Sequence, residues 1–300
     1  MRIFLTGATG FIGSRIIPEL LAAGHTVIGL TRSDAGTQEL VEAGVTPYNG
    51  TIDAPESLRA GARDADAVIH TAFDHNFANF VANCEKDRQV IRVLGDALKG
   101  SAKPLVITSG TGIGTPGPGQ LATEDVFDLN HPNPRIASEL AGQEVQAAGV
   151  KVIVVRLPQV HDTHRQGLIS PLIDVARQKG VSAYVGEGAN RWAAAHVNDV
   201  AQLYRLAVEQ GRAGERFNAV GEEGISARDI ATVIGAGLGV PVVSLAQAEA
   251  QGHFGWLGMF VGLDMPASSA WTRQRLGWYP EGPGLITDLR NMDYRSPSHG

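Results

Sequence analysis

The chain has 300 residues, of which 43% are hydrophobic, 19% charged and 6% aromatic, a globular composition long enough for about two domains. With 25 Lys and Arg against 31 Asp and Glu, its formal charge of −6 and its lack of a basic run argue against a nucleic-acid groove and a polybasic membrane patch. No window approaches the ~20 consecutive apolar residues of a membrane-spanning helix, and the single cysteine, Cys84, cannot form an internal disulfide, so we expect a soluble, cytoplasmic protein.

Short apolar runs alternate with stretches of helical periodicity over the first 160 residues. The runs predict strands at 2–6, 25–31, 67–71, 104–109 and 150–156, and the periodic stretches predict helices at 11–23, 56–62, 84–98 and 137–148. Strands that alternate with helices of this length form right-handed βαβ units. The predicted fold class is therefore α/β, a doubly wound parallel sheet of the Rossmann type with helices on both faces.

The alternation ends after residue 160. A polar loop is predicted at 161–167, helices at 168–179, 199–209 and 225–238, and a last strand of the sheet at 217–220. We interpret residues 1–160 as a dinucleotide-binding domain, with 197–220 returning to its sheet. Residues 161–196 and 221–300 are predicted to form a smaller substrate lobe.

A glycine-rich loop, TGATGFIG, lies between the first predicted strand and the first predicted helix. In the pattern G-x-x-G-x-x-G, Gly7 permits the tight turn, Gly10 lets the backbone approach a pyrophosphate, and Gly13 lets helix and strand pack closely. The free N–H groups of the helix would face the phosphates. The predicted phosphate-binding residues are Gly7, Thr9, Gly10, Phe11, Ile12 and Gly13.

The end of the second strand bears on the choice of cofactor. NAD sites place an acidic residue there, whereas NADP sites place an Arg near the 2′-phosphate. Thr31 holds the usually acidic position and Arg32 and Ser33 follow it. A guanidinium suits a phosphate, so we expect NADP(H) to be preferred, while Asp34 keeps NAD(H) as an alternative.

The loop TGATGFIG resembles that of the extended short-chain dehydrogenase/reductase superfamily, of the NAD-dependent epimerase/dehydratase type. Further segments resemble the family in the same order, namely 66–72, 106–109, 155–158, 196–200 and 276–280. The resemblance implies that Thr71 and Ala72 lie along the cofactor and that the region of Pro158 touches the nicotinamide. It also implies that Thr108 contacts the cofactor and that Ser109 holds the position of the catalytic Ser/Thr.

The family's catalytic Y-x-x-x-K motif is absent. The motif belongs on the helix directly before the sixth strand, and none of the tyrosines lies there; they are Tyr48, Tyr184, Tyr204, Tyr279 and Tyr294. Counting the family spacing along the chain places His131 at the Tyr position and Arg135 at the Lys position. The sequence therefore resembles an atypical member that has the nucleotide site but lacks the usual catalytic pair.

The chemistry follows from the groups that remain. Ser109 and Thr111 would polarise a carbonyl oxygen, and its proton would come from water or from His131. Arg135 cannot act as a base, but it could hold the ribose or a phosphate. These groups favour an NAD(P)-dependent oxidoreductase that transfers a hydride to a small aldehyde or ketone.

Two other functions stay open. One is an NADP-binding sensor or regulator without turnover, and the other is a sugar-nucleotide-type epimerase or isomerase. The expected partner is a small-molecule substrate, and a homodimer is left open.

Several other side chains invite a functional interpretation. His161 and His164 flank Asp162 and could ligate a metal, but a polar loop over the substrate is the better interpretation, and no metal site is predicted. His70 is expected to be packed near the cofactor. Trp192, Trp256 and Phe254 form either an apolar pocket wall or ordinary core.

Overall fold

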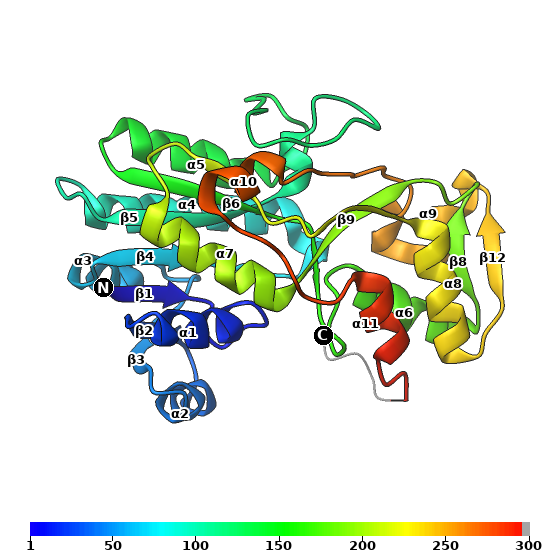
Figure 1. Cartoon of the computed structure of the whole chain (residues 1–300), viewed down its shortest axis with the longest axis horizontal. Coiled ribbons are helices and arrows are strands. Elements are labelled where there is room, and N and C mark those ends of the chain that lie inside the picture. The colour runs from blue at the N-terminus through cyan, green and yellow to red at the C-terminus, as the bar shows by residue number, and fades with distance from the viewer. Residues whose placement is uncertain (296–300) are drawn as a thin grey trace.

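The computed structural model of the protein describes residues 1–295 and contains a seven-stranded, fully parallel sheet (Figure 1). Its spatial order is β10-β6-β5-β4-β1-β2-β3, which confirms the predicted doubly wound α/β fold. The strands are β1 (Arg2–Thr6), β2 (Thr26–Thr31), β3 (Thr46–Asn49), β4 (Ala67–His70), β5 (Pro104–Gly110), β6 (Lys151–Leu157) and β10 (Arg216–Asn218).

Helices cover both faces of this sheet, so each strand is buried on two sides (Figure 1). One face packs against α1 (Gly13–Ala22), α2 (Asp34–Glu42) and α7 (Val197–Gln210), and the other against α3 (Arg59–Asp64), α4 (Phe80–Leu98) and α5 (Ile136–Ala147). In α1, the helical spacing of Ile16, Ile17 and Leu20 places all three in the core. The spacing seen in the sequence thus has a direct structural counterpart.

A second, smaller part of the molecule lies beyond the carboxyl ends of the strands (Figure 1). It holds a three-stranded sheet of β7 (Gln159–His161), β9 (Arg191–His196) and β11 (Glu222–Ser226), and a parallel pair of β8 (Ser182–Val185) and β12 (Val242–Leu245). Its helices are α6 (Ile169–Lys179), α8 (Ala227–Leu238), α9 (Ala250–Phe254) and α11 (Leu285–Asn291). We call this part the lobe; residues 296–300 of the predicted substrate lobe lie outside the described residues.

Five short 3-10 helices complete the secondary structure of residues 1–295. They are η1 (Pro55–Leu58), η2 (Phe77–Asn79), η3 (Thr111–Gly114), η4 (Gln247–Glu249) and η5 (Gly255–Met259). Within the same residues, no helix is long and apolar enough to cross a membrane.

The chain passes between the sheet domain and the lobe more than once. β10 pairs with β6, and α10 (Ala270–Leu276) packs against α7 and β10 rather than in the lobe. Trp278, which is fully buried, donates its indole N–H to the Asp199 carbonyl at 3.0 Å. The sequence placed His161 in a polar loop, but it is a buried residue of strand β7. It donates from Nδ1 to Asp288 of α11 at 2.7 Å.

A fully buried ion pair fixes the position of α5 on the sheet. Arg156 of β6 donates from Nε and Nη2 to the Glu139 carboxylate at 2.8 and 2.9 Å, and Arg216 donates to the same carboxylate at 2.9 Å. Arg156 also donates to the carbonyls of Thr123 and Val126. Burial opposes ionisation of Glu139, but the hydrogen bonds and charge of Arg156 hold its pKa below the ordinary value.

Removing one partner of this pair should cost much of the stability of the fold. We expect Glu139→Gln to lower the free energy of unfolding by about 3–5 kcal/mol, because Arg156 would keep a buried charge without its carboxylate. Urea unfolding followed by circular dichroism measures the change. The control is Glu187→Gln, whose partner Arg228 and own side chain are 50% and 92% exposed, so little change is expected. Equal unfolding midpoints in the two variants would contradict the assignment.

Candidate active site

The glycine loop lies at the carboxyl end of β1, and its three glycines differ in what an added Cβ would contact. Gly7 has φ +71°, and a Cβ there would lie 2.7 Å from Thr71 Oγ1 and 2.8 Å from the Ala72 nitrogen. A Cβ at Gly13 would overlap the Gly7 carbonyl oxygen. At Gly10 a Cβ would meet only that same oxygen, at 3.1 Å. Gly7 and Gly13 are therefore required by the protein itself, whereas Gly10 faces outward.

The tip of the loop suits an anion. Thr9 and Gly10 are exposed, and within residues 1–295 the backbone N–H groups of Phe11, Ile12 and Gly13 have no protein acceptor. These groups open the ten-residue helix α1, where the helix dipole favours negative charge. The loop thus has the donors that a dinucleotide pyrophosphate needs.

The carboxyl end of β2 is arranged around a helix cap. The Ser33 hydroxyl accepts a hydrogen bond from the Gly36 nitrogen at 3.1 Å and so caps α2, and Thr31 Oγ1 donates to the Ser33 carbonyl at 3.3 Å. Arg32 is exposed, and its charge contributes to the lowering of the pKa of Asp53, after the Lys86 hydrogen bond. Of the three predicted residues, only Arg32 has its side chain free for a cofactor.

Strand β4 is joined to the glycine loop by hydrogen bonds of Thr71 and Ala72. Thr71 donates from Oγ1 to the Thr6 carbonyl at 2.8 Å, and the Ala72 nitrogen donates to Thr6 Oγ1 at 3.3 Å. The hydroxyl of Thr108 is used within the protein, because it donates to the His70 carbonyl at 2.7 Å and contacts the Tyr204 hydroxyl at 2.6 Å. A cofactor could therefore contact Thr108 only through atoms other than its hydroxyl.

Ser109 differs from Thr108 in having an unused hydroxyl. It lies at the carboxyl end of β5, is 3% exposed, and its Oγ has no hydrogen-bond partner of ordinary geometry within residues 1–295. The hydroxyl is nevertheless close enough to Glu139 to contribute to the lowered pKa of that carboxyl, after Arg156. Thr111, in η3, makes only a long contact of 3.5 Å with the Leu157 carbonyl. Buried unsatisfied hydroxyls are uncommon and point to a function.

A buried carboxylate, Asp87 of α4, connects the glycine loop to α5. It accepts from His70 Nε2 at 3.0 Å and from Arg135 Nη1 at 2.6 Å, and it also accepts from the Ser138 hydroxyl. His70 Nδ1 is in turn 2.6 Å from Thr6 Oγ1. Burial opposes ionisation, but the Arg135 charge and the His70 hydrogen bond hold the pKa of Asp87 well below its usual range.

The two ionised residues that face the sheet from the start of α5 are Arg135 and Glu139. Arg135 donates from Nη2 to the Thr108 carbonyl at 3.0 Å, and its guanidinium lies 4.1 Å from the Phe73 ring centre. His131, which the family spacing placed at the Tyr position, precedes α5 in a half-buried loop. Its Nδ1 accepts from the Asn133 nitrogen at 3.1 Å, and no hydrogen bond joins it to Ser109 or Thr111 in the described part of the chain.

Aromatic side chains connect the loop after β4 to the lobe. Phe77 stacks on Trp256 with ring centres 4.7 Å apart, and Phe80 and Phe260 meet edge to face at 6.4 Å. The Phe73 ring, which packs against the Arg135 guanidinium, has its centre 6.4 Å from that of Phe80. These rings form an apolar wall that begins at the carboxyl ends of the strands.

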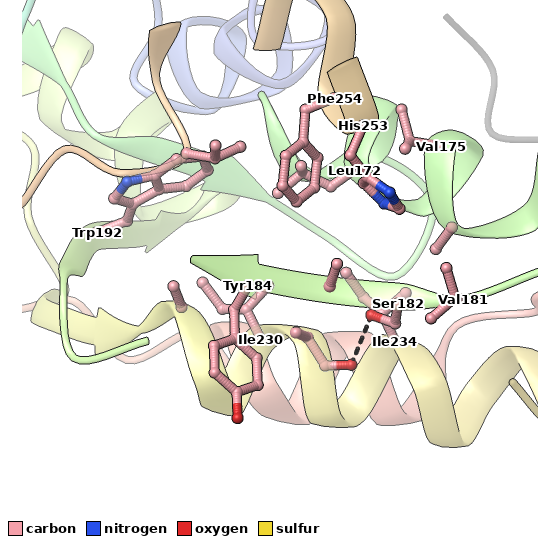
Figure 2. Close-up of a pocket in the computed structure, with 15 residues that line it drawn as sticks. Leu172, Val175, Val181, Ser182, Tyr184, Trp192, Ile230, Ile234, His253 and Phe254 are labelled. Atoms are coloured by element: carbon pink, nitrogen blue, oxygen red, sulfur yellow. Dashed lines mark hydrogen bonds between the residues drawn. The ribbon is translucent and has the colours of Figure 1, made fainter. Parts of the chain in front are cut away.

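A separate apolar cavity lies inside the lobe (Figure 2), and no residue of the glycine loop lines it. Trp192 and Phe254 line it together with Ile230 and Ile234, but Trp256 does not. Its volume of about 30 Å³ has room for one or two waters only. Trp192 and Phe254 thus serve the core of the lobe. In the described residues, no group of three His, Cys, Asp or Glu side chains could hold a metal ion.

A model of the NAD dependent epimerase/dehydratase family matches residues 3–220. The chain belongs to this family. It is 44% identical over 295 residues to an uncharacterised protein of Schizosaccharomyces pombe, covering 98% of this chain and 100% of that protein. It is 41% identical over 294 residues to one of Saccharomyces cerevisiae, covering 97% and 98%.

A solved structure shows the same fold. UDP-glucose 4-epimerase of Thermus thermophilus, in complex with NAD, has a TM-score of 0.76 and 21% identity, covering 98% of this chain and 99% of that one. The family match confirms the resemblance recognised in the sequence. The family is NAD-dependent and typically enzymatic, which leaves the particular reaction and the preferred dinucleotide of this member to be proposed.

The charged residues that organise the site, Asp87, Glu139 and Arg156, were not predicted from the sequence. A usable signal was present for two of them. Asp87 lies three and four residues before Val90 and Ile91, on the buried stripe of its helix, and Glu139 lies three residues after the buried Ile136. A carboxylate at a core-facing helical position needs a buried partner.

The glycine loop can be tested with two matched variants. We expect Gly10→Ala to keep the stability of the wild type and to lose dinucleotide affinity, because its Cβ would enter the space that the pyrophosphate occupies. We expect Gly13→Ala to be destabilised even without ligand, because its Cβ overlaps the Gly7 carbonyl. Thermal unfolding and fluorescence titration with NADH and NADPH separate the two effects. A Gly10→Ala protein that binds both with wild-type affinity would show that the phosphates lie elsewhere.

Proposed function

We propose that this protein is an NAD(P)H-dependent carbonyl reductase that acts on a small aldehyde or ketone and prefers NADP(H). The observation that carries the proposal is the buried hydroxyl of Ser109 at the carboxyl end of β5, which makes no hydrogen bond of ordinary geometry within residues 1–295 and lies near Glu139. It lies at the same edge of the sheet as the glycine loop, and open α/β sheets bind their ligands at this edge.

The residues present fit a dinucleotide. The N–H groups of Phe11, Ile12 and Gly13 would bind the pyrophosphate, the exposed Arg32 would bind a 2′-phosphate, and the region of Pro158 would face the nicotinamide. When bound, the nicotinamide supplies the hydride. The domain boundaries that we propose remain those of the sequence, with residues 161–196 and 221–300 supplying most of the substrate side.

The chain's own task at the reacting carbonyl is electrostatic. Ser109 and Thr111 would donate hydrogen bonds to the oxygen as negative charge develops there. Arg135, held by Asp87 and Ser138, places a permanent positive charge at the end of β5. The aromatic wall of Phe73 and Phe80 would exclude water beside it.

The proton must come from a group other than those of α5. Arg135 does not release its proton, and Glu139 is held ionised by Arg156. Since His131 Nδ1 accepts a hydrogen bond, the proton of its neutral ring resides on Nε2. To protonate the oxygen, His131 would have to carry a second proton and give up its hydrogen bond from Asn133; otherwise water would supply the proton. A sensor that binds NADP without turnover is the alternative if neither does so.

Ser109→Ala tests the reduction directly. If the hydroxyl stabilises the developing oxyanion, kcat should fall by about 10²–10³, while NADPH affinity should hardly change, because the hydroxyl would face the substrate. Oxidation of NADPH over a panel of aldehydes and ketones provides kcat and KM. His131→Gln is the companion variant, since kcat should fall if His131 supplies the proton and should stay unchanged if water supplies it. A wild-type protein that binds NADPH but reduces no carbonyl would favour the sensor.

Arg32→Ala tests the choice of cofactor. We expect NADPH affinity to drop by about 1.5–3 kcal/mol, which is typical of a hydrogen bond to a charged group, whereas NADH affinity should stay within about twofold because NADH has no 2′-phosphate. Fluorescence titrations at fixed salt measure both. Equal affinities of the wild type for the two dinucleotides would refute the preference.

A further inference from the structure

The loop after β7, residues 162–166, is a built turn rather than a loose connection. The Asp162 carboxylate accepts from the backbone nitrogens of His164 and Arg165 at 2.7 and 2.8 Å, and the Asp162 nitrogen donates to the Arg165 carbonyl at 2.9 Å. Gln166, fully buried, donates from Nε2 to the Asp162 carbonyl. These bonds fix the backbone of Arg165 before any ligand arrives.

The same turn is attached to the glycine loop. Asp162 forms an ion pair with Arg15 of α1 at 3.5 Å, and the Arg165 guanidinium carbon lies 5.7 Å from the ring centre of Phe11. Phe11 is one of the residues whose N–H group faces the proposed phosphates. Arg165 thus extends from the lobe to the phosphate-binding loop of the sheet domain.

The charge of Arg165 also affects a residue in the loop after β4. His75, in the loop after β4, keeps solvent contact, yet partial desolvation lowers its pKa, and the charges of Arg165 and Arg135 lower it further. The Arg165 charge therefore acts on the loop after β4 as well as on Phe11 in the glycine loop.

Arg165 has no carboxylate partner, in contrast to the other cations nearby. Arg135 is paired with Asp87 and Arg15 with Asp162, whereas no Asp or Glu oxygen within residues 1–295 lies within 4.0 Å of the Arg165 guanidinium. The loop TGATGFIG contains no cationic side chain. Its own donors to a phosphate are backbone N–H groups and the Thr9 hydroxyl, since the Thr6 hydroxyl contacts His70 and Ala72. Arg165 is the cation near Phe11 that has no carboxylate partner within residues 1–295.

We propose that Arg165 binds the pyrophosphate of the dinucleotide from the lobe side, opposite the N-terminus of α1. The inference rests on the cofactor site of the proposed function but not on the reaction, since any nicotinamide dinucleotide contains this pyrophosphate. A guanidinium presents a planar set of donors that matches phosphate oxygens. Arg165 and Arg32 then have separate tasks, because only Arg32 distinguishes NADP from NAD.

Equilibrium titration without substrate tests the assignment. The variants are Arg165→Gln, which removes the charge, Arg165→Lys, which keeps it, and the exposed Arg290→Gln of α11 as a control for charge alone. The ligands are NADH, NADPH and ADP-ribose, which contains the pyrophosphate but no nicotinamide. We expect Arg165→Gln to weaken all three by the same factor, about tenfold to a hundredfold, with a smaller loss for Arg165→Lys and none for Arg290→Gln. The loss should shrink as salt rises.

Each other outcome overturns the proposal in a recognisable way. A loss confined to NADPH would place Arg165 at the 2′-phosphate, and unchanged binding of all three ligands, with a raised KM for the carbonyl, would place it at the substrate. Thermal unfolding without ligand should be the same in Arg165→Gln and wild type, since no ion pair is lost, while the stabilisation by ADP-ribose should diminish. A wild type that binds none of the three ligands would refute the proposed function as well.

Discussion

The buried carboxylate of Asp87 is the group on which the carboxyl edge of the sheet depends. An unpaired charge in such a place would cost several kcal/mol, so its neighbours must supply donors. His70 comes from β4, Arg135 from the approach to α5 and Ser138 from α5 itself. Through His70 and Thr6, the same network reaches the end of β1. One carboxylate thereby fixes the relative positions of the glycine loop, β4 and α5, the elements that meet at the proposed cofactor site.

The same network limits the chemistry of the site. The charged groups at the start of α5 are paired in the interior, Arg135 with Asp87 and Glu139 with Arg156, and neither can exchange a proton near neutral pH. The proposed catalysis at this edge therefore relies on hydrogen-bond donors and fixed charge, which act in a site of low dielectric without rearrangement. Ser109 is the exception within this buried set, because its hydroxyl makes no hydrogen bond of ordinary geometry within residues 1–295 and interacts only loosely with Glu139.

How far the sequence predicts this structure depends on the range of the interactions. The parallel sheet, α1 and the glycine loop follow from local spacing and were predicted. Strand β3 and helix α2, with the sequences TPYN and DAGTQELVE, were missed because their few apolar residues give no clear period. His161 was expected in a polar loop, yet it is buried because Asp288, 127 residues away, provides its partner. Such pairing between distant residues leaves no local pattern.

The same difference between local spacing and pairing of distant residues applies to the candidate site. The glycines of the proposed phosphate site could be recognised from spacing because their constraint is a turn within seven residues. The contacts that hold α5 could not be recognised in this way. Counting the family spacing pointed to His131, whereas the residues that hold the helix are Asp87 of α4 and Arg156 of β6, which are distant in the chain. Arg165 had no visible signal either, because its significance comes from its contact with Phe11, which is distant in the chain.

The repeated passage of the chain between its two parts explains how a lobe residue can serve the cofactor site. Along the chain, β10 comes before β11 and α8, and α10 comes after them, yet both β10 and α10 pack in the sheet domain. Trp278 is fixed to the start of α7 by its hydrogen bond to the Asp199 carbonyl. The loop of Asp162 is bonded internally and paired to Arg15. Because these contacts exist without a ligand, little conformational entropy remains to be lost when an anion binds between Arg165 and α1. A preorganised cation contributes more of its interaction energy to affinity than a mobile one.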